Sequence, residues 1–196
     1  MLKLKNTGSL VVISSPSGAG KTTITKKLIL KKNTELSVSL TTRKPRISER
    51  NKIDYFFVRK NFFKSQIKKK KFLEYAKVFD NYYGTLKKNI KNLLKKNKTI
   101  ILDIDWQGAR QIKKNMPNIT TTIFILPPSL RELKKRLVKR EKDISFVNKR
   151  MKKAKKEITH WKEYDYVVVN DNLKNCLKEI YKILDINKKK PFNFQL

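Results

Sequence analysis

The segment that most constrains the fold is residues 9–22, SLVVISSPSGAGKT, which runs from an apolar stretch through a loop of small residues into a helical pattern. A strand that enters such a loop before a helix N-terminus aims backbone N–H groups inward and forms a nest for anions. Lys21 adds a charge that can reach β- and γ-phosphate, and the Thr22 hydroxyl lies where such loops place a Mg²⁺ ligand. The pattern therefore predicts a site for a nucleoside triphosphate and its metal, formed by Ser15, Pro16, Ser17, Gly18, Ala19, Gly20, Lys21, Thr22 and Thr23.

This loop departs at one position from the strict pattern G-x-x-x-x-G-K-[ST], because Ser15 stands where that pattern has its first glycine. The first tight turn must therefore form around a residue that carries a Cβ atom. An ordinary strand-to-helix turn rich in small residues remains the alternative interpretation. The order of strand, loop, Gly-Lys-Thr and helix favours the phosphate site.

The chain is strongly basic, with 49 Lys and Arg against 16 Asp and Glu in 196 residues, and its length suits one domain. A net charge of +33 attracts nucleic acids, anionic membranes and phosphorylated metabolites alike. The lysines spread through every segment, and the runs at 68–71 and 188–190 lack interleaved aromatic residues. We therefore favour compositional drift over a nucleic-acid footprint and expect no specific nucleic-acid partner.

The single cysteine, Cys176, excludes an internal disulfide and is interpreted as buried packing in a reducing compartment. One Cys and one His, His160, do not provide a metal cluster. No apolar stretch approaches the length of a membrane span, and the first ten residues lack an apolar signal core. We expect a cytoplasmic protein without a membrane partner.

Short runs rich in β-branched residues recur between amphipathic helical segments, at residues 11–14, 99–105, 121–126 and 166–170. Their interiors are almost entirely apolar, as in strands that are buried on both faces. The pattern predicts an α/β fold in three layers, with a parallel sheet between helices. Ser129 and Glu132 form a capping-box pattern for a helix whose inward side is predicted to carry Leu130, Leu133 and Leu137.

Two insertions interrupt this rhythm without a linker rich in Pro, Gly or Ser. In residues 36–86 the residue types alternate as in short strands, which predicts a small β-rich subdomain. The sequence of residues 130–160 predicts a basic helical segment. The core then comprises about 1–35, 87–129 and 161–190, within a single domain over 1–196.

Six blocks of the chain, in order, resemble the guanylate kinase family over about residues 11–171: SSPSGAGKTT, SVSLTTRKPR, DYFFV, FLEYAKVFDNYYGT, ILDIDWQGA and VNKR. The resemblance implies a P-loop nucleoside monophosphate kinase. Such an enzyme moves the γ-phosphoryl group of ATP to GMP, and to dGMP, to give ADP and GDP with Mg²⁺. It further implies that residues 36–86 bind GMP and that residues 130–160 form a lid.

The acceptor phosphate needs positive groups that hold it in line with ATP, and arginine forks bind phosphate oxygens in pairs. Arg43 and Arg46 are spaced to act in this way, and Tyr55 and Tyr83 supply phenolic donors. The resemblance assigns all four to the GMP phosphate. A solvated arginine pair and ordinary aromatic packing are the alternatives.

Guanine presents N1–H and a 2-amino group as neighbouring hydrogen-bond donors, so a carboxylate can accept from both. Adenine does not present this pair of donors and therefore does not suit a carboxylate. The resemblance assigns this contact to Glu74, with Ser39 and Thr85 near the other base edge and Asp105 near the amino group. A glutamate on the wet face of an edge strand is the alternative for Glu74. Asp103 is assigned to Mg²⁺ together with Thr22.

The resemblance also assigns three lid arginines, Arg136, Arg140 and Arg150, to the triphosphate. Catalysis is then expected from Lys21, Arg43, Arg136 and Arg150. The family pattern has glycine where this chain has Ser48 and Lys52, which leaves the geometry of the acceptor loop open.

Three other functions stay open on the sequence alone. A noncatalytic guanylate-kinase-like interaction module uses the same fold, but such modules characteristically lack an intact phosphate loop. A nucleic-acid-binding P-loop protein would use the charge. Adenylate or thymidylate specificity is the nearest alternative among kinases, and Glu74 argues against it. The sequence leaves a monomer and a homo-oligomer equally open.

Overall fold

The structure is a computed structural model, and it describes residues 8–47, 49–78, 80–141 and 143–188. Its core is a five-stranded parallel sheet with the order β2-β7-β1-β8-β9. The strands span Thr34–Leu36 (β2), Thr99–Asp103 (β7), Ser9–Ser14 (β1), Thr120–Leu126 (β8) and Tyr166–Val169 (β9). The predicted α/β class and parallel sheet are confirmed.

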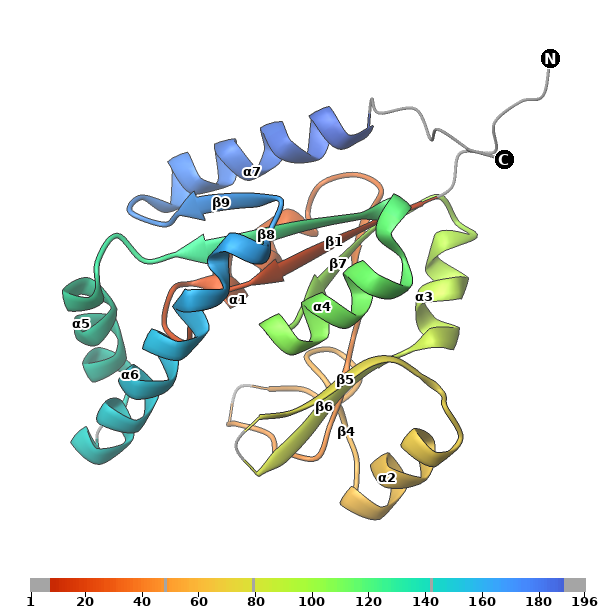
Figure 1. The fold of residues 1–196 in the computed structure, drawn as a ribbon, viewed down its shortest axis with the longest axis horizontal. Coiled ribbons are helices and arrows are strands. Elements are labelled where there is room, and N and C mark those ends of the chain that lie inside the picture. The colour runs from red at the N-terminus through yellow and green to blue at the C-terminus, as the bar shows by residue number, and fades with distance from the viewer. Residues whose placement is uncertain (1–7, 48, 79, 142, 189–196) are drawn as a thin grey trace.

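Helices cover both faces of this sheet and produce three layers (Figure 1). Val11 and Ile13 of β1 lie in an apolar cluster with residues of α1 (Lys21–Leu28) and α7 (Leu173–Lys188), among them the buried Cys176. Leu10 and Val12 point to the other face, where α3 (Lys87–Leu94) and α4 (Trp106–Asn115) contribute to a second cluster. The two-residue period of a strand accounts for this division.

A second, smaller sheet has the order β4-β3-β6-β5 and lies away from the core sheet (Figure 1). Its strands span Phe56–Phe57 (β4), Leu40–Thr41 (β3), Asn81–Leu86 (β6) and Phe72–Val78 (β5). The helix α2 (Lys60–Lys68), which the sequence analysis did not predict, buries Phe63 against Phe72 with ring centroids 4.4 Å apart. This sheet therefore has an apolar cluster of its own.

Two helices, α5 (Leu130–Arg140) and α6 (Ile144–Ile158), project from the core as a pair (Figure 1). The Ser129 side chain accepts a hydrogen bond from the backbone N–H of Glu132, which confirms the predicted cap. Leu133 and Leu137 are fully buried against α6, but the inward placement predicted for Leu130 is wrong, since this residue is 42% exposed. The first turn of α5 lies outside the cluster that joins the two helices.

Two 3₁₀ segments, η1 (Pro117–Ile119) and η2 (Thr159–Glu163), complete the elements. Among the described residues, none of the helices is long and apolar enough to span a membrane.

Candidate active site

One crevice, with a volume of about 620 Å³, lies where the core, the small sheet and the helix pair meet. It is lined by all but two of the predicted site residues: Ser15, Pro16, Ser17, Gly18, Gly20, Lys21, Thr22, Thr23, Ser39, Arg43, Arg46, Tyr55, Glu74, Tyr83, Asp103, Asp105, Arg136, Arg140 and Arg150. Ala19 and Thr85 are fully buried and do not line it. The Thr85 hydroxyl lies 3.0 Å from that of Ser39, so it can act on the crevice through Ser39.

The phosphate loop takes its shape from two glycines. Gly18 and Gly20 have φ values of 96° and 97°, a left-handed conformation that disfavours residues with a Cβ atom. Gly20 caps the N-terminus of α1, and the next residue is Lys21. Ser15 is not among the described residues with a positive φ, and its hydroxyl donates to the Pro16 carbonyl oxygen at 3.1 Å. The missing first glycine is therefore accommodated without a left-handed turn at this position.

Lys21 and Asp103 meet at the carboxyl end of the sheet, because β1 and β7 pair in register there. The Lys21 Nζ atom lies 2.5 Å from Asp103 Oδ1 and donates a hydrogen bond of 3.2 Å to the Ile104 carbonyl oxygen. The Thr22 side chain also faces the crevice. In the part of the chain that the structure describes, no group of three or more His, Cys, Asp or Glu side chains could hold a metal. A Mg²⁺ ion here would need oxygen ligands from phosphates and water.

Arg43 is held by an acid and two rings. Its Nη2 atom donates to both oxygens of Glu49, at 2.8 and 2.9 Å, and its guanidinium lies 5.7 Å and 5.9 Å from the ring centroids of Tyr55 and Phe57. Burial lowers the pKa of Arg43, but the hydrogen bond to Glu49 and the nearby Tyr83 and Glu49 outweigh it, so the net shift is upward. Arg43 therefore stays charged in a half-buried place.

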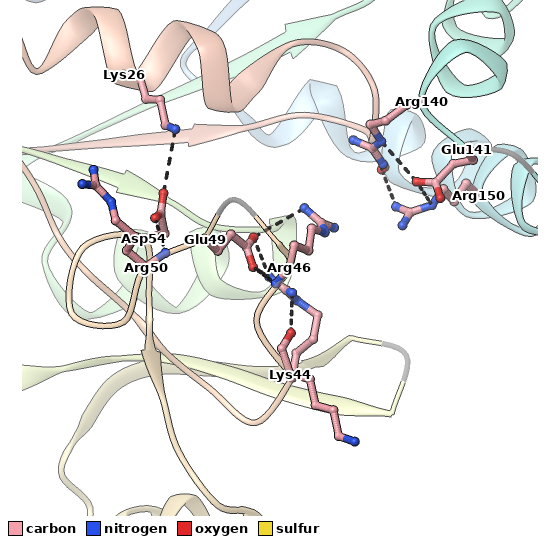
Figure 2. A network of polar contacts seen from close by, with 11 residues as sticks. Lys26, Lys44, Arg46, Glu49, Arg50, Asp54, Arg140, Glu141 and Arg150 are labelled. Carbon is pink, nitrogen blue, oxygen red and sulfur yellow. Dashed lines mark hydrogen bonds and ion pairs between the residues drawn. The ribbon is translucent and has the colours of Figure 1, made fainter.

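Arg46 belongs to the same group (Figure 2). Its backbone N–H donates to Glu49 Oε2 at 2.8 Å, and its Nη1 atom lies 3.6 Å from Glu49 Oε1. The Arg46 side chain is 56% exposed, so its fork reaches into the crevice with little else to hold it. Ser48, one of the two positions that depart from the family pattern, lies outside the described residues. Lys52, the other, keeps a left-handed φ of 67° without being glycine.

The two predicted tyrosines stand together on the acceptor side. The rings of Tyr55 and Tyr83 meet edge to face, with centroids 6.0 Å apart. Burial, with a further contribution from Asp103, raises the pKa of Tyr55, so this phenol stays protonated and can donate. Tyr55 also lines the crevice, so it does more than pack against its neighbours.

Glu74 is almost fully buried, with 3% exposure, although it lies on β5 at the rim of the small sheet. Its Oε1 atom has no hydrogen-bond partner among the described residues. Burial raises its pKa to about 7, against the lowering effect of Thr85, and Asp105 raises it further. A Cβ atom at Gly108 would lie only 2.5 Å from Glu74 Oε2, so helix α4 approaches the carboxylate closely at this glycine. The wet-face alternative for Glu74 is wrong.

Asp105 lies beyond the end of β7 and caps α4 instead of extending the strand. Its Oδ1 atom accepts from the backbone N–H groups of Gln107 and Gly108, at 3.0 and 3.1 Å. These bonds fix the carboxylate at the crevice wall.

Two of the three arginines predicted for the lid contact the phosphate loop and a second acid. Arg140 and Arg150 both donate to the Ser17 hydroxyl, at 3.3 and 3.0 Å, and both lie 3.2 Å from Glu141 Oε1. Figure 2 shows Glu141 with these two arginines, separate from the group around Glu49. Burial and the like charge of Arg140 lower the pKa of Arg150. Arg136 instead donates to the Asn170 carbonyl oxygen at 3.2 Å.

Several residues of the site were not predicted from the sequence. Lys153 and Glu157 line the crevice from α6, with Lys153 Nζ 3.3 Å from Glu157 Oε1. Glu49 and Glu141 hold the arginines described above. Asn170, which bonds the phosphate loop and Arg136, could have been found, because it is the last residue of the predicted strand 166–170, at the edge of the sheet where ligands bind.

The two basic residue types are distributed unevenly. Five of the nine arginines line the crevice, whereas among the lysines that the structure describes only Lys21 and Lys153 do. Arginine, whose planar guanidinium can form two parallel hydrogen bonds, is thus concentrated at the crevice.

The family model described as Guanylate kinase matches residues 7–187. A guanylate kinase of Rickettsia prowazekii is 47% identical over 195 residues, which cover 98% of each chain. One of Bartonella henselae is 42% identical over 189 residues, 94% of this chain and 85% of the other. The crystal structure of guanylate kinase from Anaplasma phagocytophilum superposes with a TM-score of 0.81 at 36% identity, and the match covers 95% of this chain and 89% of that one.

Proposed function

The chain belongs to the guanylate kinase family, and from that premise we propose how its own residues transfer the γ-phosphoryl group of ATP to GMP. An oxygen of the GMP phosphate attacks the γ-phosphorus, the bond to the β-phosphate oxygen breaks, and ADP and GDP leave. The acceptor oxygen is already anionic, so the reaction needs positioning and charge neutralisation rather than a general base.

The donor side is the loop of residues 15–23. Backbone N–H groups at the start of α1 would surround the β-phosphate, and Lys21 would follow the charge as it moves onto the leaving oxygen. Its contact with Asp103, 2.5 Å, keeps the ammonium at the carboxyl end of the sheet. Arg136, Arg140 and Arg150 would approach the transferring group from the lid, since all three line the same crevice.

The donor set suits Mg²⁺. This ion keeps several waters and takes one or two protein oxygens besides phosphate oxygens, and the Thr22 hydroxyl and the Asp103 carboxylate provide such oxygens. When bound, the metal neutralises charge on the β- and γ-phosphates. Thr22 and Asp103 would orient it.

The acceptor side selects GMP. Arg43, Arg46, Tyr55 and Tyr83 would bind the phosphate, and Glu74 would accept hydrogen bonds from guanine N1–H and the 2-amino group. The unpartnered Oε1 atom of Glu74 supports this role, because a buried acceptor without a partner is costly unless a ligand satisfies it. Ser39, with Thr85 behind it, and Asp105 would complete the base pocket.

The observation that carries this proposal is the meeting of both sides in one crevice, from Lys21 to the buried Glu74. A coupled assay of ADP release tests it, with GMP, dGMP, AMP, UMP and TMP offered in turn with Mg-ATP. We expect turnover with the guanine nucleotides and little with the others. Comparable turnover with AMP or TMP would contradict the assignment of Glu74.

The proposal also covers the parts of the chain beyond the crevice. We propose that the domain is divided into a core, a GMP-binding subdomain over about 36–86 and a lid over about 130–160. We propose that the enzyme works in the cytoplasm, where ATP and GMP are supplied, without a specific nucleic-acid partner. Filter binding at rising salt tests the last point, since affinity that disappears at physiological salt reflects bulk charge alone.

A further inference from the structure

The acceptor arginines are held in place by a carboxylate that does not itself line the crevice. Glu49 lies behind the crevice wall and contacts both Arg43 and Arg46, and its side chain is only 12% exposed. Both of its oxygens accept from the same nitrogen of Arg43, and one of them also accepts from the Arg46 backbone. One acid thus contacts two proposed phosphate ligands.

We propose that Glu49 is a positioning residue for the acceptor, which fixes the orientation in which Arg43 and Arg46 meet the phosphate of GMP. The inference rests on the proposed function, because it requires these two arginines to bind that phosphate. Glu49 acts through them and not by contact with GMP.

The Arg43 guanidinium has contacts on several sides besides the crevice. Nη2 is bonded to Glu49, Nη1 donates to the Lys44 carbonyl oxygen at 2.7 Å, and the rings of Tyr55 and Phe57 lie beside the plane. Such a long side chain would otherwise lose much rotamer freedom when it binds a ligand. Positioning by Glu49 removes part of that cost from GMP binding.

Glu49 also closes the loop that carries Arg46. Its backbone N–H donates to the Arg46 carbonyl oxygen at 3.0 Å while its side chain accepts from the Arg46 N–H at 2.8 Å. These reciprocal bonds form a short turn, followed by Lys52 in its left-handed conformation. The turn is therefore closed by one backbone bond and one side-chain bond of Glu49, and Lys52, at a usual glycine position of the family, lies just after it.

Charge opposes this role, and its sign makes the proposal testable. A carboxylate behind the arginines repels the incoming phosphate, so a mere counter-ion would weaken GMP binding. Two arginines and one glutamate still leave a net positive charge for the phosphate. If positioning dominates, removal of the Glu49 charge lowers the affinity for GMP; if repulsion dominates, the removal raises it.

The experiment compares GMP with guanosine by calorimetric titration of the full chain and of Glu49→Gln. Guanosine has the base and ribose without the phosphate, so it reports on the pocket around Glu74 alone. We expect a loss of about tenfold or more in affinity for GMP, because charged hydrogen bonds are removed, and no change for guanosine. In steady state, KM for GMP rises while KM for ATP stays the same.

Two further variants serve as controls. Glu163 accepts hydrogen bonds of 2.6 Å from the Arg110 guanidinium, and neither residue lines the crevice. Glu163→Gln therefore removes a comparable carboxylate, and we expect it to change the affinity for neither GMP nor guanosine. Glu49→Asp keeps the charge on a shorter side chain and is expected to recover part of the GMP affinity. Recovery by the aspartate would show that the carboxylate itself, rather than a side chain of the length of glutamate, orients the arginines.

The outcomes are distinct. Unchanged or tighter GMP binding by Glu49→Gln overturns the inference. A parallel loss of affinity for guanosine also overturns it, because that result would indicate a structural role for Glu49. Arg43→Ala in the same titration tests the proposed function separately. If that variant keeps its GMP affinity, the phosphate assignment fails; if only Glu49→Gln keeps it, the positioning role alone fails.

Discussion

The side-chain amide of Asn170 donates a hydrogen bond of 2.7 Å to the carbonyl oxygen of Ala19, which joins the end of β9 to the phosphate loop. Ala19 is fully buried and Asn170 nearly so. A Cβ atom at Gly20 would lie 2.4 Å from the same amide nitrogen. The bond therefore holds the loop from behind, on the side away from the crevice.

We expect Asn170→Ala to lower stability and raise KM for ATP. The buried Ala19 carbonyl would lose its partner, which costs about 1–3 kcal/mol. Thermal unfolding and steady-state kinetics measure the two effects. Asn175→Ala, on the exposed side of α7, is the control and should change neither. An unchanged melting temperature and KM in Asn170→Ala would show that the loop keeps its shape unaided.

Lys21→Ala should abolish phosphoryl transfer while the protein remains folded. In the proposed mechanism the ammonium stabilises charge that develops on the leaving oxygen, and loss of one such donor typically costs about 10²–10³-fold in rate. Activity is measured by ADP release and folding by circular dichroism. Lys27→Ala, an exposed lysine on the same helix, is the matched control. Retention of GMP turnover by Lys21→Ala would contradict the proposed role.

The rate with GMP should depend on pH through Glu74. Its pKa is raised to about 7, so the carboxylate that we propose to accept from guanine is present above that pH and is lost as the pH falls through it. We expect kcat/KM for GMP to drop below pH 7, since this ratio reports the ionisation of the free enzyme.

Glu74→Gln separates this effect from the ionisation of GMP itself, whose phosphate has a second pKa near 6, roughly that of phosphoserine. The variant should lose the preference for GMP over AMP and keep only the lower transition. A profile identical to that of the parent protein would show that Glu74 does not titrate in this range.

Lys52→Gly should stabilise the protein. Lys52 adopts a φ of 67°, which costs about 1 kcal/mol for a residue with a Cβ atom and little for glycine. Its N–H bond to the Tyr55 carbonyl oxygen, 2.8 Å, is retained in the variant. The melting temperature should rise by about 2–4 °C.

A glycine elsewhere should have the opposite effect. Lys91 is exposed in the interior of α3, where glycine costs about 1 kcal/mol, so Lys91→Gly should melt lower than the parent protein. If Lys52→Gly also melts lower, the backbone at residue 52 is not strained.

The parallel strands and the phosphate loop could be predicted from the sequence because their determinants are local. An apolar run indicates a buried strand, and Gly20, Lys21 and Thr22 lie next to one another. Glu74 needed the family resemblance, since its burial depends on α4, which approaches at Gly108. Nothing near residue 74 in the sequence indicates that helix.

Contacts between distant segments could not be predicted in this way. The bonds of Ser17 to Arg140 and Arg150 span more than a hundred positions. Leu130 has the helical spacing of a buried residue but is exposed, because the periodicity of a sequence indicates which face of a helix is apolar and not which residues pack against it. Glu141 is one acid among many charges, and only the fold makes it a partner of two arginines.

Among the described residues, arginine is concentrated in the crevice and lysine outside it, so the exterior can change independently of the proposed catalytic residues. The outer ammonium groups could be exchanged for neutral or acidic side chains, and a far less basic homologue would still perform the same transfer. We expect the five guanidinium groups of the crevice to tolerate no such exchange, since a lysine in their place would keep the charge and lose the second hydrogen bond.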